Sequence, residues 1–235
     1  MAEAVKAIRI CGLSKLTLVD YPGKVAATVF TGGCNLRCPF CHNASLVLGG
    51  APEIPEGDVF SFLEKRRGLL DGVCVTGGEP LLNRDLGDFL ARIKGMGYPV
   101  KLDTNGCFPD ALKGAVSRGL VDYVAMDVKS DPENYAETVG VPGFDLAPIR
   151  ESIAFLLSGS VDCEFRTTVA RGLHTPEIVR GAARMIAGAQ RYFLQMFVDS
   201  GDLIGEGFTS FSEAEMRVLM EAAAPYVGEV RLRGI

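Results

Sequence analysis

The sequence predicts an α/β fold, an incomplete (β/α)6 barrel of the TIM type preceded by an N-terminal hairpin. Short apolar runs typical of strands alternate with helical patterns along the chain, and repeated strand–helix units build parallel sheets. Six such strands are too few for a closed eight-stranded barrel. Polar motifs follow the strand ends, which is where barrel enzymes carry their sites. A doubly wound open sheet remains the alternative.

The predicted strands are short runs that alternate with helical patterns. They cover residues 25–30, 73–76, 99–103, 122–128, 163–169 and 192–198, and a last run, EVRLR, closes the chain. Two β-like pieces at 5–10 and 16–19 precede a Pro22-Gly23 turn. We expect these pieces to form a hairpin or lid against the main domain.

Helical patterns separate the strands. They cover residues 56–70, 85–96 and 146–158, and further helices begin near 109, 175 and 212. Three of them carry end signals: Gly97 follows one helix, Thr175-Pro176 opens another, and Ser212 and Glu215 have capping-box spacing.

Length and composition suit one domain. The chain has 235 residues, of which 48% are apolar and 23% charged, enough to bury a sizeable core. We divide it into an N-terminal extension (1–24), a partial barrel core (25–200) and a C-terminal helix and strand (201–235). Residues 130–148 have little periodicity, so we expect a mobile loop there.

Charge and cysteine usage exclude several classes of protein. A net charge of −5 argues against nucleic-acid binding, which needs a basic face. No apolar run has the length of a membrane span, and the first residues lack a secretory signal. Seven cysteines are an odd number that suits a reducing compartment, so we expect a cytoplasmic protein.

Three cysteines form the densest motif. Cys34, Cys38 and Cys41 lie in a C-x-x-x-C-x-x-C run after the first core strand. Such thiolates can hold an iron–sulfur cluster, and with three ligands one iron is left open. A Cys3His zinc site that includes His42 is the alternative, although adjacent Cys41 and His42 would strain to reach one ion. The other four cysteines, Cys11, Cys74, Cys107 and Cys163, are expected to be structural.

Further polar motifs follow the next strands. TGGEP (76–80) offers two glycines that permit close backbone approach and an acid, Glu79, that can bind an ammonium group. LDTNG (102–106) and AMDVK (125–129) each end in charged or polar residues. Asp127 and Lys129 are two apart, as are Arg166 and Thr168, so each pair shares one face of its strand. Acidic strand ends can hold a hard cation.

Together, GCNLRCPFCHN, TGGEP, LDTNG, MDVK and FRTTVARG resemble the radical S-adenosylmethionine (SAM) family, and within it the activating enzymes of glycyl radical enzymes. The opening GLSKLTLVDYPGK resembles the longer form of the activating proteins of anaerobic ribonucleoside-triphosphate reductase. The resemblance covers residues 12–172 and, more loosely, the remainder. It implies the same incomplete barrel.

The resemblance also implies roles for individual residues. One 4Fe–4S cluster would be held by Cys34, Cys38 and Cys41, with Phe40 beside it. S-adenosylmethionine would be bound by Gly77, Gly78, Glu79, Asp103, Asp127, Lys129, Arg166 and His174. A monovalent cation would lie among Asp103, Thr104, Met126 and Asp127.

The implied reaction is reductive cleavage of S-adenosylmethionine to methionine and a 5′-deoxyadenosyl radical. That radical takes a hydrogen from a glycine Cα of a partner enzyme, and a flavodoxin or ferredoxin supplies the electron. The N-terminal resemblance favours anaerobic ribonucleoside-triphosphate reductase as partner over a pyruvate formate-lyase type. A radical SAM enzyme acting on a small molecule, like 7-carboxy-7-deazaguanine synthase, is the alternative, and a zinc-stabilised binding protein is a third.

Overall fold

The structure is a computed structural model in which residues 8–235 are described. Its strands are β1 (Ile10–Thr17), β2 (Ala26–Thr31), β3 (Gly72–Gly77), β4 (Val100–Thr104), β5 (Tyr123–Asp127), β6 (Asp162–Val169), β7 (Arg191–Met196) and β8 (Glu229–Arg233). Its helices are α1 (Ala44–Leu48), α2 (Glu56–Lys65), α3 (Leu86–Gly95), α4 (Pro109–Ser117), α5 (Tyr135–Thr138), α6 (Ala147–Leu157), α7 (Pro176–Met185) and α8 (Glu213–Ala223), with 3-10 turns η1 (Pro80–Leu82) and η2 (Ala224–Tyr226).

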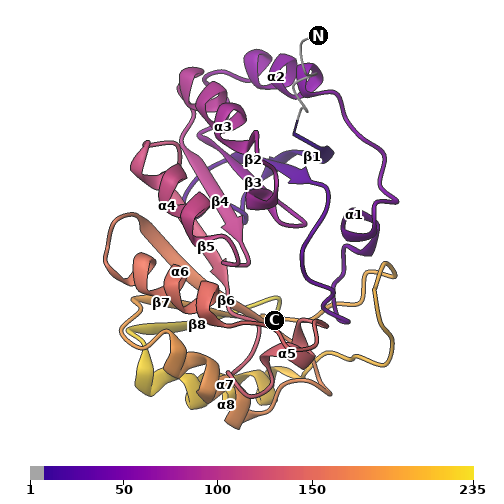
Figure 1. The fold of residues 1–235 in the computed structure, drawn as a ribbon, viewed down its shortest axis with the longest axis vertical. Helices are drawn as coiled ribbons and strands as arrows, with labels where there is room; N and C mark the ends of the chain where they lie inside the picture. The colour runs from indigo at the N-terminus through magenta and orange to yellow at the C-terminus, as the bar shows by residue number, and fades with distance from the viewer. Residues whose placement is uncertain (1–7) are drawn as a thin grey trace. The chain divides into compact units, whose positions relative to one another are not determined.

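The strands form one sheet whose spatial order follows the chain from β1 to β8 (Figure 1). A doubly wound sheet reverses its strand order at a switch point, so that alternative is wrong. β1 and β8 are the two edges, which means that the sheet is open. The predicted α/β fold, an incomplete barrel with an N-terminal hairpin, is confirmed.

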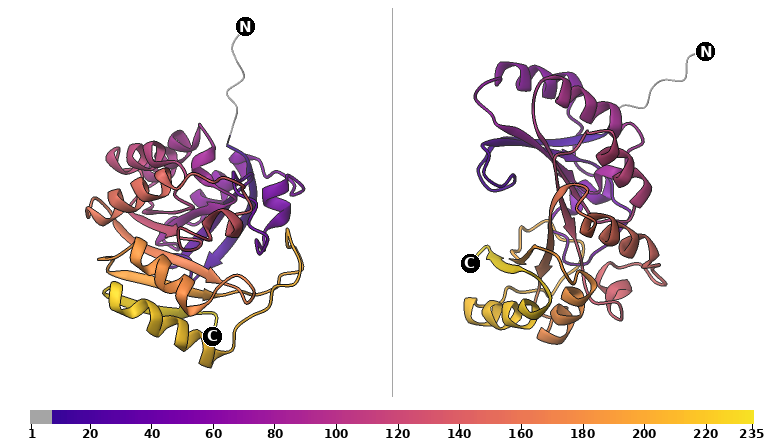
Figure 2. Two further views of the ribbon diagram at one scale, coloured as in Figure 1. Left: turned by 60° about the horizontal axis from the view of Figure 1, so that its bottom comes forward. Right: turned by 90° about the vertical axis from the view of Figure 1, so that its left-hand side faces the viewer.

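One compact unit contains β1 to β4 with α2, α3 and most of α1 and α4. β1 is antiparallel to β2, whereas β2, β3 and β4 are parallel. β2 and β3 are almost continuously buried, as in strands covered on both faces. Helices α2 to α4 follow one another along one side of these strands (Figure 2), and the rings of Phe60 and Phe89 join α2 to α3 with centroids 5.3 Å apart.

The other compact unit contains most of β5, then β6 to β8 and α5 to α8. β6, β7 and β8 are parallel, with Arg166 opposite Phe193 and Gln195 opposite Arg233. α7 and α8 lie side by side, and α8 also packs on β7 and β8 (Figure 1). The faces that these two helices bury include Val179, Ala182, Met216 and Leu219.

Some predicted elements differ from the structure. A single strand, β1, replaces the pieces expected at 5–10 and 16–19; residues 5–7 of the first piece lie outside the described residues. Helix α2 ends at Lys65 and not at residue 70. Gly68 follows with a left-handed φ of 76°, a conformation that ends helices. Residues 130–148 contain α5 and the buried Tyr135 and Val139. Among the described residues, no helix is long and apolar enough to cross a membrane.

Candidate functional site

In the first unit, the glycine pair of TGGEP lies against the start of the cysteine loop. Gly77 has a φ of 126°, a conformation that side chains rarely adopt. A Cβ atom on Gly78 would overlap the carbonyl oxygen of Gly33 and lie 3.4 Å from Cβ of Cys34. The amide of Glu79 donates to that same Gly33 oxygen at 2.8 Å. The close approach therefore requires glycine and fixes the end of β3 beside Cys34.

Glu79 carries a fully buried carboxylate just after this turn. Its Oε1 accepts hydrogen bonds from the amide of Leu81 at 3.1 Å and from the hydroxyl of Thr104 at 2.8 Å. These two bonds fix the orientation of the carboxylate at the ends of β3 and β4. A buried, oriented carboxylate of this kind is suited to bind an ammonium group.

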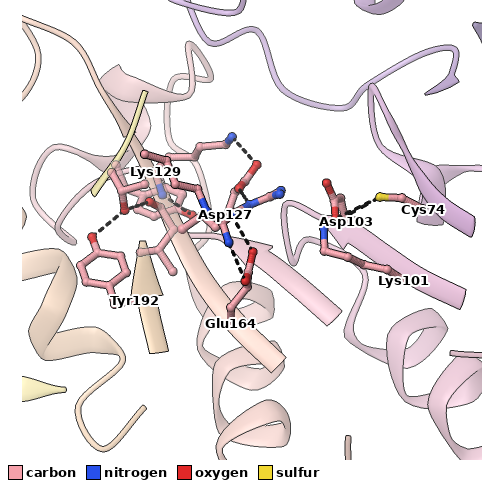
Figure 3. A network of polar contacts seen from close by, with 12 residues as sticks. Cys74, Lys101, Asp103, Asp127, Lys129, Glu164 and Tyr192 are labelled. Atoms are coloured by element: carbon pink, nitrogen blue, oxygen red, sulfur yellow. Dashed lines mark hydrogen bonds and ion pairs between the residues drawn. The ribbon is translucent and has the colours of Figure 1, made fainter. Parts of the chain in front are cut away.

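Asp103 has a partner that the sequence did not predict as a site residue. Lys101, two positions earlier on β4 and 1% exposed, forms an ion pair with its carboxylate (Figure 3). The thiol of Cys74 on β3 lies 3.7 Å from Asp103 Oδ1 and 3.8 Å from Lys101 Nζ. Cys74 is thus a buried polar neighbour of this pair as well as a small core residue.

In the second unit, Cys38 and Cys41 are linked by a turn in which the Cys41 amide donates to the Cys38 carbonyl at 3.0 Å. The ring of Phe40 between them is buried, 5.9 Å from the ring of His174 and nearly perpendicular to it. The segment near Gly205 holds this loop, because its amide donates to the Pro39 carbonyl at 2.7 Å. A backbone hydrogen bond to Pro39 therefore fixes the segment between Cys38 and Cys41.

Asp127, Lys129 and Arg166 come together in the same unit, as their strand spacing predicts. The Asp127 carboxylate accepts from Lys129 Nζ and from Arg166 Nε, both at 2.9 Å (Figure 3). Burial alone would raise the pKa of Asp127, but Arg166 and Lys129 outweigh it and hold that pKa well below its usual range. Burial likewise would lower the pKa of Lys129, yet Asp127 and Cys38 raise it. This cluster keeps one net positive charge.

His174 is buried and bonded to backbone through both ring nitrogens. Nδ1 accepts from the amide of Ala170 at 3.1 Å, and Nε2 lies 2.9 Å from the carbonyl oxygen of Lys129. This pattern assigns the proton to Nε2, so the ring is neutral. Burial lowers the pKa of His174, mainly through loss of solvation. The imidazole supports Phe40 and the backbone of Lys129.

The residues predicted to hold a monovalent cation have other contacts. Thr104 donates to Glu79 and Asp103 pairs with Lys101 in one unit; Asp127 pairs with Lys129 and Arg166 in the other. Met126 is buried against Gly106, where a Cβ would overlap its methyl group. Within residues 8–235, no group of three Cys, His, Asp or Glu side chains is arranged to hold a metal ion. The ligand sets of the cluster and the cation stay predictions.

A match to the family model of the radical SAM superfamily covers residues 28–180. The chain belongs to the radical SAM superfamily. This radical SAM protein is 31% identical over 234 residues to "Putative glycyl-radical enzyme activating enzyme" of Methanocaldococcus jannaschii, with 96% of each chain covered. It is also 31% identical over 155 residues to the 7-carboxy-7-deazaguanine synthase of Koribacter versatilis, covering 65% of each chain.

Among solved structures, SuiB of Streptococcus suis bound to S-adenosylmethionine matches with a TM-score of 0.68. The match has 14% identity and covers 86% of this chain and 48% of that one, so it supports the fold alone. The resemblance to the radical SAM family, in its activating-enzyme branch, is confirmed. Enzymes of this superfamily use a 4Fe–4S cluster and S-adenosylmethionine, so both cofactor predictions are confirmed at the family level. The donor set fits the cluster, because the motif offers three cysteine thiols, the ligands that iron–sulfur clusters take.

Proposed function

We propose that this radical SAM enzyme installs a glycyl radical on a partner enzyme, with anaerobic ribonucleoside-triphosphate reductase as the favoured partner. The observation that carries the proposal is the likeness, along 96% of both chains, to a protein named for activating glycyl radical enzymes. The opening GLSKLTLVDYPGK supports the choice of reductase. We further propose a cytoplasmic location, no nucleic-acid partner, and a flavodoxin or ferredoxin as electron donor.

The site residues have distinct proposed roles. Cys34, Cys38 and Cys41 hold the cluster. The Gly77-Gly78 backbone lets the amino-acid end of S-adenosylmethionine approach, and the Glu79 carboxylate accepts hydrogen bonds from its ammonium group. The excess positive charge of Lys129 and Arg166 over Asp127 attracts its carboxylate, and their N–H groups donate hydrogen bonds to its ribose. His174 and Phe40 pack beside each other in the same unit.

The cluster and S-adenosylmethionine, when bound, would supply the electron transfer and the radical chemistry of hydrogen abstraction. The protein itself binds, orients and excludes water. Glu79 is suited to orientation because its carboxylate is fully buried and already fixed by Leu81 and Thr104. The Lys129 ammonium stays charged at neutral pH, since Asp127 raises its pKa.

The test is anaerobic incubation of the reduced enzyme with S-adenosylmethionine and candidate partners, read by electron paramagnetic resonance. A glycyl doublet on the reductase is expected with wild type and with Cys163→Ala, a cysteine outside the motif, and no doublet with Cys38→Ala. Release of 5′-deoxyadenosine without a doublet on any partner would favour a small-molecule substrate, the reading that the 7-carboxy-7-deazaguanine synthase relative supports. Colourless protein with one zinc per chain would contradict the whole assignment.

A further inference from the structure

Lys101 and Asp103 form a buried ion pair on strand β4 of the first unit. All five residues of β4 are buried, which is unusual for a strand that reads VKLDT. Lys101 is opposite Cys74 in the parallel pairing of β3 and β4, and its ammonium meets the Asp103 carboxylate and the Cys74 sulfur. A lysine that is 1% exposed needs a charged partner, and Asp103 is that partner.

The Lys101–Asp103 pair is connected to Glu79 through the next residue of β4. Thr104, the residue after Asp103, is the hydroxyl donor to Glu79. The family resemblance assigns Asp103 and Thr104 to a monovalent cation, but a second cation at Asp103 would be repelled by the ammonium of Lys101. In the second unit, Asp127 likewise already faces Lys129 and Arg166. A soluble monovalent cation therefore does not fit these carboxylates.

We propose that Lys101 takes the place of a monovalent cation at Asp103, as a covalently attached ammonium group that neutralises this carboxylate. Binding of S-adenosylmethionine then needs neither K⁺ nor Na⁺. The choice of S-adenosylmethionine as the ligand rests on the proposed function. It adds Lys101 as a positioning residue, which acts through Asp103 and does not touch the cofactor.

The first experiment uses the unmodified holoenzyme. Equilibrium dialysis with labelled S-adenosylmethionine is compared in KCl, NaCl and choline chloride at one ionic strength, so that general screening is constant. The dissociation constant is expected to change less than about twofold among the three salts. Binding that is about tenfold weaker in choline chloride would overturn the proposal, because the wild type would then need a small cation.

The second experiment removes the ammonium. Lys101→Met removes the ammonium that faces Asp103, and affinity in choline chloride is expected to fall about tenfold and to recover in KCl. Lys94→Met is the matched control, since Lys94 pairs with Asp122 at the surface of the same unit. The control should behave as the wild type does. Equal affinity of Lys101→Met and wild type in choline chloride would overturn the proposal.

Thermal unfolding of the cofactor-free protein gives a readout that does not depend on S-adenosylmethionine. KCl in place of choline chloride should raise the unfolding midpoint of Lys101→Met and leave the wild type unchanged. If Lys101→Met fails to fold, Lys101→Met/Asp103→Asn removes both charges and should fold without cation dependence.

An unfolding midpoint of the wild type that rises in KCl or NaCl relative to choline chloride would contradict the role of Lys101. Absence of a glycyl doublet contradicts only the proposed function.

Discussion

At the scale of single residues, Asp127 is the carboxylate whose surroundings the sequence predicted best. Its spacing from Lys129 places both on one face of the strand end, and Arg166 reaches it from β6. Lys101 was not predicted, because the strand pattern VKLDT does not reveal whether a lysine points to solvent or into the sheet. Burial depends on what packs over β4, and that is a tertiary property.

Replacing Asp127 should destabilise the fold in a pH-dependent way. The folded-state pKa lies below that of the unfolded chain, so the carboxylate stabilises the protein above about pH 4 and loses this effect as the pH falls further. Asp127→Asn removes the carboxylate that Lys129 and Arg166 share and should lower the free energy of unfolding by about 3 kcal/mol at pH 7. Urea unfolding at pH 7 and pH 3 measures this.

The loss should shrink at pH 3, where the wild type begins to lose the same interaction. Glu229→Gln is the control, because Glu229 and Arg231 form an exposed pair with side chains 47% and 59% exposed. It should change stability by less than about 1 kcal/mol. A loss in Asp127→Asn no larger than that of the control would contradict the assignment.

At the scale of elements, periodicity located α3 and α6, and end signals located the starts of α7 and α8. The capping box of Ser212 and Glu215 opens α8 as expected, and the Thr175 hydroxyl accepts from the amide of Ile178 to open α7. These signals are local hydrogen bonds and need no tertiary information. Helix α5 escaped prediction because four residues are too few for a periodic pattern.

Strand β8 is attached to the second unit by a buried ion pair that crosses β7. Arg233 donates to both oxygens of Glu164 at 2.8 and 2.9 Å, and its guanidinium lies 3.5 Å from the ring centroid of Phe193. Glu164 is fully buried. Arg233→Met should therefore cost about 3 kcal/mol, because it removes the guanidinium that pairs with both oxygens of a buried carboxylate.

Urea unfolding of three variants separates pairing from packing. Arg233→Met/Glu164→Gln should recover most of the loss, because it removes both charges. Arg231→Met, on the same strand but exposed, should cost less than about 1 kcal/mol. If the double variant is no more stable than Arg233→Met, packing of the guanidinium on Phe193 and not charge pairing holds β8.

At the scale of the whole molecule, the alternation of strands and helices gave the fold class but not the order of strands. Both candidate topologies contain the same local elements, and only the pairing between strands separates them. The sheet order from β1 to β8 settles that choice. The same limit applies to the site, since the sequence names residues at strand ends but not the hydrogen bonds between them, such as that of Thr104 with Glu79.

Binding of S-adenosylmethionine should raise the stability of the whole chain. A ligand that binds the native state alone stabilises it by about 2.7 kcal/mol at one hundred times its dissociation constant, which corresponds to a rise of roughly 5–10 °C in Tm for a chain of this size. Anaerobic circular dichroism of the cluster-loaded protein, with and without S-adenosylmethionine, measures the shift.

Two glycine variants show whether the shift comes from the β3 end. Gly78→Ala forces a Cβ into the Gly33 carbonyl, so it should displace the backbone beside Cys34 and abolish the rise. Gly114→Ala, on α4 with no atom within 4 Å of the new Cβ, should keep the full rise and gain up to about 1 kcal/mol from helix propensity. A full rise in Gly78→Ala would mean that S-adenosylmethionine binds away from the glycine pair. The roles proposed for Gly77, Gly78 and Glu79 would then fail together, because one turn positions all three.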